Sequence, residues 1–239
     1  MCDTCGCGQP GHSHDHPHEK ELVQLHEDVM IHNNEYAQTN RQFFSDRRIL
    51  TLNLLSSPGS GKTTLVERTI KAIDGQYPVA VIEGDQQTEL DAERIRRTGA
   101  PALQINTGAG CHLDAHQIHH ALDDLQPVNQ SLLIIENVGN LVCPSMFDLG
   151  EHHKVVVLSV TEGEDKPIKY PHMFHAADVV VYNKIDLLPY VDFDISKSQE
   201  YARQLNDKIL FFELSAATGE GLPSWLEWLD RQVTADHSG

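Results

Sequence analysis

The chain has 239 residues, and its 35 acidic side chains against 18 basic ones give a formal net charge of −17. This length is enough for one large α/β domain with a sizeable core, and the charge argues against nucleic acid or an anionic membrane surface as a partner. No apolar run is long enough to span a bilayer, and the amino-terminal residues lack the apolar core of a secretory signal. We therefore expect a cytoplasmic protein.

Residues 1–18 form a low-complexity segment that is rich in cysteine and histidine. Cys2, Cys5 and Cys7 make a C-x-x-C-x-C pattern, and three thiolates so close in sequence can surround one ion with little chain strain. Three soft donors and a nitrogen suit Ni²⁺ in a square plane or Zn²⁺ in a tetrahedron, and the spacing does not choose between them. We predict a flexible metal-binding tail, with a redox-labile disordered segment as the alternative.

The pattern after the tail predicts one flanking helix and then a single α/β domain. Residues 19–46 have apolar side chains at helical spacing in a polar-rich background, which favours a helix on the flank of the domain. Over residues 47–234 apolar runs alternate with amphipathic segments, as in a mostly parallel sheet with helices on both faces. The predicted strands are 49–55, 79–83, 102–106, 131–136, 154–160, 178–183 and 208–214, and the predicted helices are 62–73, 88–97, 113–124, 195–206 and 221–231. Residues 235–239 are predicted to be a disordered tail.

A phosphate-binding loop is predicted between the first strand and the first helix of this domain. The segment from Ser56 to Thr64 reads Ser-Ser-Pro-Gly-Ser-Gly-Lys-Thr-Thr, and only its first residue departs from the usual motif, which has glycine there. The glycines let backbone N–H groups turn inward around a phosphate, and the helix start adds partial positive charge. The loop residues are Gly59, Ser60, Gly61, Lys62, Thr63 and Thr64, with Lys62 on the β/γ-phosphates and the Thr63 hydroxyl on Mg²⁺. The fold class is therefore a three-layer P-loop NTPase with about seven strands.

Two carboxylates end predicted strands near this loop. Asp85 follows the second strand, and Glu136 ends the fourth, with glycine three residues later. Ordinary GTPases carry D-x-x-G at the second position, and the longer Glu136 can still bind Mg²⁺ directly or through water. Asp85 is the candidate for orienting the attacking water, with helix capping as its alternative role.

A second group of metal ligands is predicted around the same strand ends. Cys111 and His112 are adjacent in a glycine-rich loop before a helix, and Cys143 comes seven residues after Glu136. Free cysteines are often small buried side chains, and that reading stays open here. Adjacent Cys and His at a loop-to-helix junction are less typical of packing, and a site with these three ligands is incomplete, so a dimer could complete it.

A guanine-reading site is predicted at the end of the sixth strand. The chain runs from an apolar strand into Asn183-Lys184-Ile185-Asp186, which resembles the N-K-x-D motif of GTPases. The Asp186 carboxylate can accept from both N1–H and the 2-amino group of guanine, whereas adenine would leave it unpaired. We expect Lys184 to lie along the purine and Asn183 to brace the loops. The loop of Ser215, Ala216 and Ala217 looks like the S-A-K loop of GTPases, whose backbone N–H meets guanine O6, with Ala217 in the place of Lys.

These stretches resemble the hydrogenase nickel-insertion GTPases, the HypB family, over nearly the whole chain. The matching stretches are 2–7, 53–64, 83–95, 110–112, 136–151 and 161–171. The related urease nickel GTPase carries Cys-Pro-His where this chain has Cys143-Pro144-Ser145, which argues against that sibling.

The resemblance implies a slow GTPase of the SIMIBI class, which dimerises across its nucleotides and supports nickel insertion into the large subunit of [NiFe]-hydrogenase. It implies that Thr63, Asp85 and Glu136 hold Mg²⁺ and act with Lys62 in catalysis, that Cys111, His112 and Cys143 form a dimer-interface metal site, and that Cys2, Cys5 and Cys7 form a tighter nickel site. The expected cofactors are GTP or GDP, Mg²⁺, Ni²⁺ and Zn²⁺. The expected partners are a second copy, an accessory nickel-binding protein and the hydrogenase large subunit.

Two other classes of protein stay open from the residues alone. The metal ligands could form structural or storage Zn²⁺ sites in a binding module, which chelation would then destabilise strongly. The phosphate loop could also belong to an ATP-dependent phosphotransferase, against which Asp186 speaks.

Overall fold

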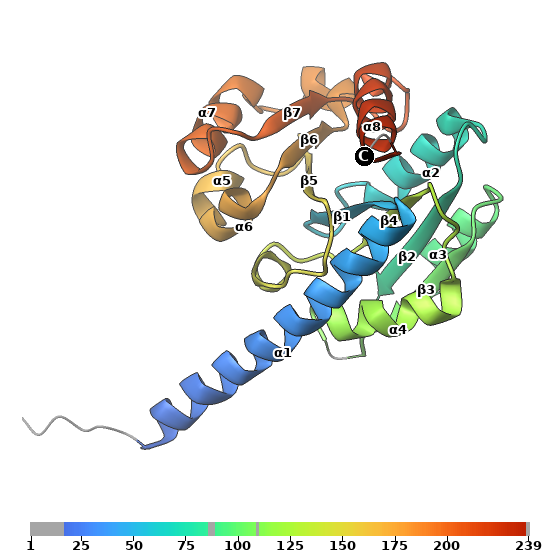
Figure 1. The fold of residues 1–239 in the computed structure, drawn as a ribbon. Helices are drawn as coiled ribbons and strands as arrows, with labels where there is room; N and C mark the ends of the chain where they lie inside the picture. The colour runs from blue at the N-terminus through green and yellow to red at the C-terminus, as the bar shows by residue number, and fades with distance from the viewer. Residues whose placement is uncertain (1–16, 86–88, 109, 238–239) are drawn as a thin grey trace, which may run out of the picture.

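The computed structural model describes residues 17–85, 89–108 and 110–237, and a parallel sheet lies at its centre (Figure 1). The strands are β1 (Leu50–Ser56), β2 (Val79–Asp85), β3 (Ala102–Asn106), β4 (Leu132–Glu136), β5 (His153–Ser159), β6 (Val179–Asn183) and β7 (Leu210–Glu213). Their order in the sheet is β3-β2-β4-β1-β5-β6-β7, and every pair of neighbours is parallel. The predicted fold class, with seven strands, is confirmed.

Both faces of the sheet are buried, which explains the continuous apolar runs that predicted the strands. In β4, Leu132 and Ile134 join a cluster with α2 (Lys62–Ile73) and α8 (Leu222–His237), whereas Leu133 and Ile135 join a cluster on the other face. This alternation follows from the two-residue period of a strand. The other face is covered by α1 (Pro17–Arg47) and α4 (Ala115–Leu125), and further along by α6 (Pro171–Ala176) and α7 (Ile195–Leu205). Helix α3 (Leu90–Arg96) packs beside β2 and β3.

Helix α1 lies along α4 and extends well past the rest of the domain (Figure 1). Its carboxyl-terminal half is fixed by asparagines that reach into the domain: Asn40 Nδ2 donates to Ala115 O at 2.8 Å and to Leu149 O at 3.1 Å. The guanidinium of Arg41 binds both carboxylate oxygens of Asp148 at 2.8 Å. The flanking helix is therefore held by the buried contacts of Asn40 and by an exposed ion pair, which a sequence pattern based on apolar spacing does not reveal.

Several elements differ from the prediction. The short helices α5 (Lys166–Lys169) and α6 were not predicted, and neither were the 3₁₀ helices Cys143–Met146 and Ile185–Tyr190. Helix α8 continues to His237, whereas a tail was predicted from residue 235. The reason is that Val233 is buried in the core beside Trp228 and Leu229, so the last turns of α8 remain packed against the domain.

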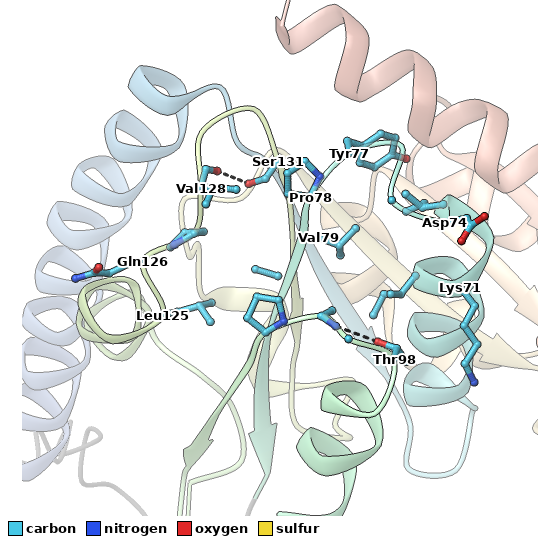
Figure 2. Close-up of a pocket in the computed structure, with 18 residues that line it drawn as sticks. Lys71, Asp74, Tyr77, Pro78, Val79, Thr98, Leu125, Gln126, Val128 and Ser131 are labelled. Carbon is cyan, nitrogen blue, oxygen red and sulfur yellow. Dashed lines mark hydrogen bonds between the residues drawn. The ribbon is translucent and has the colours of Figure 1, made fainter.

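Cavities lie at both ends of the sheet. The one at the amino end of β2 has a volume of about 570 Å³ and is lined by residues such as Pro78, Val79, Leu125 and Val128 (Figure 2). None of the predicted site residues lines it. Among the described residues, no helix has both the length and the apolar character needed to cross a bilayer.

Candidate nucleotide and metal site

The side chains predicted to bind nucleotide and metal lie at the carboxyl ends of the strands, the edge at which open parallel sheets bind ligands. A cavity of about 560 Å³ lies there. The predicted residues that line it are Gly59, Gly61, Lys62, Thr63, Thr64, Asp85, Glu136 and Lys184. The residues predicted to bind nucleotide that do not line it are Ser60, Asn183, Asp186, Ser215, Ala216 and Ala217.

The loop between β1 and α2 has the backbone shape that close approach to a phosphate requires. Gly59 and Gly61 have φ angles of 77° and 94°, in the left-handed region that glycine adopts without strain. Lys62 is buried, and its Nζ donates to Ser56 Oγ at 2.7 Å. Ser56 stands where the motif usually has glycine, so this departure supplies a hydroxyl that holds Lys62, the lysine predicted to bind phosphate, at the end of β1.

Two of the side chains predicted to hold a divalent cation meet beside this lysine. Thr63 Oγ1 donates to Glu136 Oε1 at 2.8 Å, and Lys62 Nζ lies 4.0 Å from the same oxygen. Glu136 is only 6 % exposed, and its Oε2 has no hydrogen-bond partner among the described residues. Burial raises the pKa of Glu136, and Lys62 offsets only part of that rise. A hydroxyl and a carboxylate with an unused buried oxygen fit Mg²⁺, which prefers hard oxygen ligands.

Two further carboxylates come from β2. Glu83 faces Glu136 in the β2–β4 register, and burial, followed by the charge of Glu136, raises its pKa well above the ordinary value. No motif in the sequence singled out Glu83. Asp85 ends β2 and lines the cavity, whereas the residue at the start of α3 is Glu89. Asp85 is therefore not the cap of that helix, the alternative role that the sequence had left open.

Asn183 joins the phosphate loop to the predicted guanine loops. It is 1 % exposed, and its Nδ2 donates to Ser60 O at 2.9 Å. Its Oδ1 accepts from Ala216 N at 3.0 Å and from Lys184 N at 2.8 Å. Three segments that are distant in sequence therefore meet at one side chain.

Lys184 and Asp186 flank the place that a base would take. Lys184 has a φ of 65°, and its Nζ donates to Gly59 O at 2.7 Å. It therefore links the predicted guanine motif to the phosphate loop. Asp186 lies in the first turn of the 3₁₀ helix Ile185–Tyr190, whose amino-terminal cap residue is Lys184. Its Oδ1 is buried without a hydrogen-bond partner among the described residues, which leaves a carboxylate oxygen for a donor on a ligand.

The three ligands of the second predicted metal group lie together. One donor atom each from Cys111, His112 and Cys143 falls within 4.8 Å of the others, and both cysteines are half-buried. The contact with Cys143, and then burial, raise the pKa of Cys111, whereas burial lowers the pKa of His112. A neutral imidazole and two thiols suit Ni²⁺ or Zn²⁺ once the thiols lose their protons. Cys2, Cys5 and Cys7 lie outside the described residues.

The metal group is tied to both carboxylate-bearing strands by contacts that the sequence did not predict. Asn137 directly follows Glu136, and its Oδ1 accepts a hydrogen bond from Leu113 N at 3.1 Å. Asn140 Nδ2 donates to Cys111 O at 3.3 Å. The Leu113 side chain also fills the space beside Gly84, where an added Cβ would lie 2.7 Å from Leu113 Cγ. The loop that carries Cys111 and His112 is thus packed against the neighbours of Asp85 and Glu136.

A phosphate loop and a guanine-type loop at the carboxyl edge of a parallel sheet define a P-loop GTPase. Residues 50–213 match the model of the CobW/HypB/UreG nucleotide-binding domain. The chain belongs to this family and, within it, to the HypB group.

Relatives and solved structures agree with that assignment. Hydrogenase maturation factor HypB of Azotobacter chroococcum is 56% identical over 214 residues, which are 90% of this chain and 70% of that protein. The crystal structure of HypB from Archaeoglobus fulgidus has a TM-score of 0.79 and 40% identity, and the match covers 85% of this chain and 99% of that one. The structure of HypB from Helicobacter pylori in complex with nickel has a TM-score of 0.79 and 38% identity, with 85% and 96% covered.

Proposed function

We propose that this protein is a Mg²⁺-dependent GTPase that binds nickel and supports its insertion into the large subunit of a [NiFe]-hydrogenase. The observation that carries the proposal is the position of Cys111, His112 and Cys143 against the two strand ends that bear Asp85 and Glu136. The name of the Azotobacter chroococcum relative and the nickel complex of the Helicobacter pylori relative support it. Zn²⁺ is a second ion that the same donors accept.

GTP hydrolysis in this site consists mainly of positioning and charge stabilisation. Lys62 and the N–H groups of residues 59–64 hold the β- and γ-phosphates, and Asp85 orients the attacking water. Thr63, Glu136 and Asp85 are the residues that would hold Mg²⁺, which when bound offsets the negative charge of the phosphates. Arg94 lines the cavity, but its guanidinium is held by Glu67 at 2.6 Å and Asp91 at 3.2 Å. With its guanidinium held there, Arg94 does not stabilise the charge that develops on the phosphates during hydrolysis. We therefore propose a slow intrinsic turnover.

Nucleotide and metal influence each other through the contacts between the two sites. A shift of the segment from Glu136 to Cys143 changes both an oxygen ligand of Mg²⁺ and a sulfur ligand of nickel. The hydrogen bond from Leu113 N to Asn137 transmits the same shift to the loop that holds Cys111 and His112. Thermodynamic reciprocity requires that metal changes nucleotide affinity by the same factor.

A second copy of the chain would complete the metal site. Cys111, His112 and Cys143 provide three ligands, and Val142 and Met146 beside Cys143 are 56 % and 47 % exposed. Exposed apolar side chains around an incomplete site fit a homodimer interface. An accessory nickel-binding protein and the hydrogenase large subunit are the further partners in this proposal. A cytoplasmic location belongs to it as well, because a reducing compartment keeps the thiols available.

The function is tested by titrating nickel into the full chain loaded with GDP or with a non-hydrolysable GTP analogue. A variant with Cys2, Cys5 and Cys7 changed to Ala isolates the site described above. We expect affinities that differ about fivefold or more between the two nucleotide states, and equal affinities would overturn the coupling.

Background binding needs its own control, because the exposed His116 and His120 have Nε2 atoms 3.0 Å apart on α4. Adding Cys111→Ala and Cys143→Ala to the variant without Cys2, Cys5 and Cys7 measures this background. In cells, a variant that carries only Cys111→Ala and Cys143→Ala should lose hydrogenase activity and regain it with excess nickel. Loss of activity that nickel does not restore would argue against metal delivery.

A further inference from the structure

The loop after β7 leaves one backbone N–H group for a ligand. Within the described residues 215–219, every N–H group but that of Ala217 donates to an acceptor in the protein. The bonded groups are Ser215 N to Glu220 O (2.8 Å), Ala216 N to Asn183 Oδ1 (3.0 Å), Thr218 N to Ser215 Oγ (3.1 Å) and Gly219 N to Ser215 O (2.8 Å). The Ala217 N–H is thus the donor that this loop can offer to guanine O6.

Arg68 on α2 holds the peptide group to which this N–H belongs. Its Nε donates to Ala216 O at 2.9 Å, and its Nη2 donates to Ala217 O at 2.6 Å. The Ala216–Ala217 peptide is trans, so its C=O and N–H point in opposite directions from one plane. When Arg68 holds the Ala216 carbonyl on one side, the Ala217 N–H must point to the other side.

The same helix also carries the phosphate-binding residues. Lys62 and Thr63 lie in the first turn of α2, and Arg68 lies about 9 Å further along the helix axis. The planar guanidinium presents several donors in a fixed fork, which suits two neighbouring carbonyls, whereas a lysine ammonium would act as a point donor. One rigid helix therefore fixes the phosphates at its start and the O6-reading loop two turns later.

We infer that Arg68 is a positioning residue for guanine specificity, because it holds the Ala216 carbonyl and thereby aims the Ala217 N–H at O6 of the base. This inference rests on the proposed binding of guanine nucleotides. It separates two parts of base recognition: Asp186 reads N1–H and the 2-amino group, and the loop held by Arg68 reads O6.

The test compares three nucleotides by calorimetry with the full chain. GDP is the reference, 6-thio-GDP replaces O6 by a weak sulfur acceptor, and IDP lacks the 2-amino group. We expect the wild type to bind GDP about tenfold more tightly than 6-thio-GDP, the value of one hydrogen bond. In Arg68→Ala this ratio should fall to about two or less, while the ratio of IDP to GDP affinity stays unchanged. In Arg68→Lys, the ratio of GDP to 6-thio-GDP affinity should lie between the wild-type value and the Arg68→Ala value.

If Arg68 had a purely structural role, Arg68→Ala would bind all three nucleotides more weakly by the same factor. The ratios of 6-thio-GDP and IDP affinity to GDP affinity would then stay unchanged, which would overturn the inference. A wild type that does not distinguish 6-thio-GDP from GDP would overturn it too, since no O6 donor would then exist. Failure of the wild type to prefer GDP over IDP or ADP would instead refute the proposed guanine site. Lys71→Ala on the same helix is the matched control and should change neither ratio.

Discussion

Asn183 offers the sharpest test of how the nucleotide site is assembled. It makes three hydrogen bonds, to Ser60 O at 2.9 Å and from Ala216 N and Lys184 N at 3.0 and 2.8 Å. The change Asn183→Ala removes all three and leaves three backbone groups without a partner in a region that is 1 % exposed at Asn183 itself. We expect the free energy of unfolding to fall, and GDP to bind more weakly.

The magnitude follows from the number of bonds. At about 1 kcal/mol for each hydrogen bond, the loss of stability is about 3 kcal/mol, and more if water cannot reach the unpaired groups. For a chain of this size that corresponds to a fall in Tm of roughly 6–12 °C. The phosphate loop and the loop of Ala216 also lose their common brace, so the Kd for GDP should rise about tenfold or more.

The assays are urea denaturation without nucleotide and calorimetric titration with GDP. Asn206→Ala is the matched control, because Asn206 Nδ2 donates to Ala177 O at 2.9 Å and its Oδ1 accepts from Lys208 N at 3.0 Å. These bonds join the ends of α6 and α7 and reach neither the phosphate loop nor the loop of Ala216, so this control should lower stability and leave the Kd for GDP unchanged. If Asn183→Ala lost stability but kept its GDP affinity within twofold, the bracing role would be refuted.

Two further predictions concern packing and pH. Gly84→Ala places a Cβ 2.7 Å from Leu113 Cγ, so it should reduce the free energy of unfolding by about 1–3 kcal/mol in the wild type and by almost nothing in a Leu113→Ala background. Urea denaturation of the four proteins measures this, and an equal loss in both backgrounds would contradict the packing argument. Burial raises the pKa of Glu151 above its ordinary value of 4.5, although Lys154 offsets part of the rise. A carboxyl whose pKa is raised in the folded state stabilises the protein at low pH and loses that contribution as pH rises through the folded pKa. The stability of the wild type relative to Glu151→Gln should therefore fall with rising pH above 4.5, by up to about 1.4 kcal/mol per unit. A difference that stayed constant from pH 5 to 7 would show that Glu151 does not titrate in this way.

Most strands could be predicted because their signal is local. The apolar run in the predicted strand 178–183 marks a strand buried on both faces, and the structure has β6 at Val179–Asn183. The short helices α5 and α6 span four and six residues, too few for a periodic pattern to stand out. The end of α8 was missed for a different reason: the packing of Val233 against the core decides it, and the composition of the tail does not reveal this packing.

The phosphate loop and the guanine motif are also local, since their residue types and spacing are enough to name them. The partners of these residues are not local. Ser56 holds Lys62, Arg68 holds the loop of Ala216 and Ala217, and Asn137 holds Leu113. Such contacts depend on which loops the sheet order brings together, so no window of sequence contains them.

The sequence by itself determined the class of fold and the chemical types of ligand, because strand burial, glycine-rich turns and thiol or carboxylate groups are properties of short segments. Tertiary structure alone decided that Cys111 and Cys143, from loops after β3 and β4, lie within reach of one ion. It also decided that this group touches the neighbours of Asp85 and Glu136. The physical reason is that parallel strands deliver their carboxyl ends to one edge, and only the order and register of the strands determine which ends become neighbours.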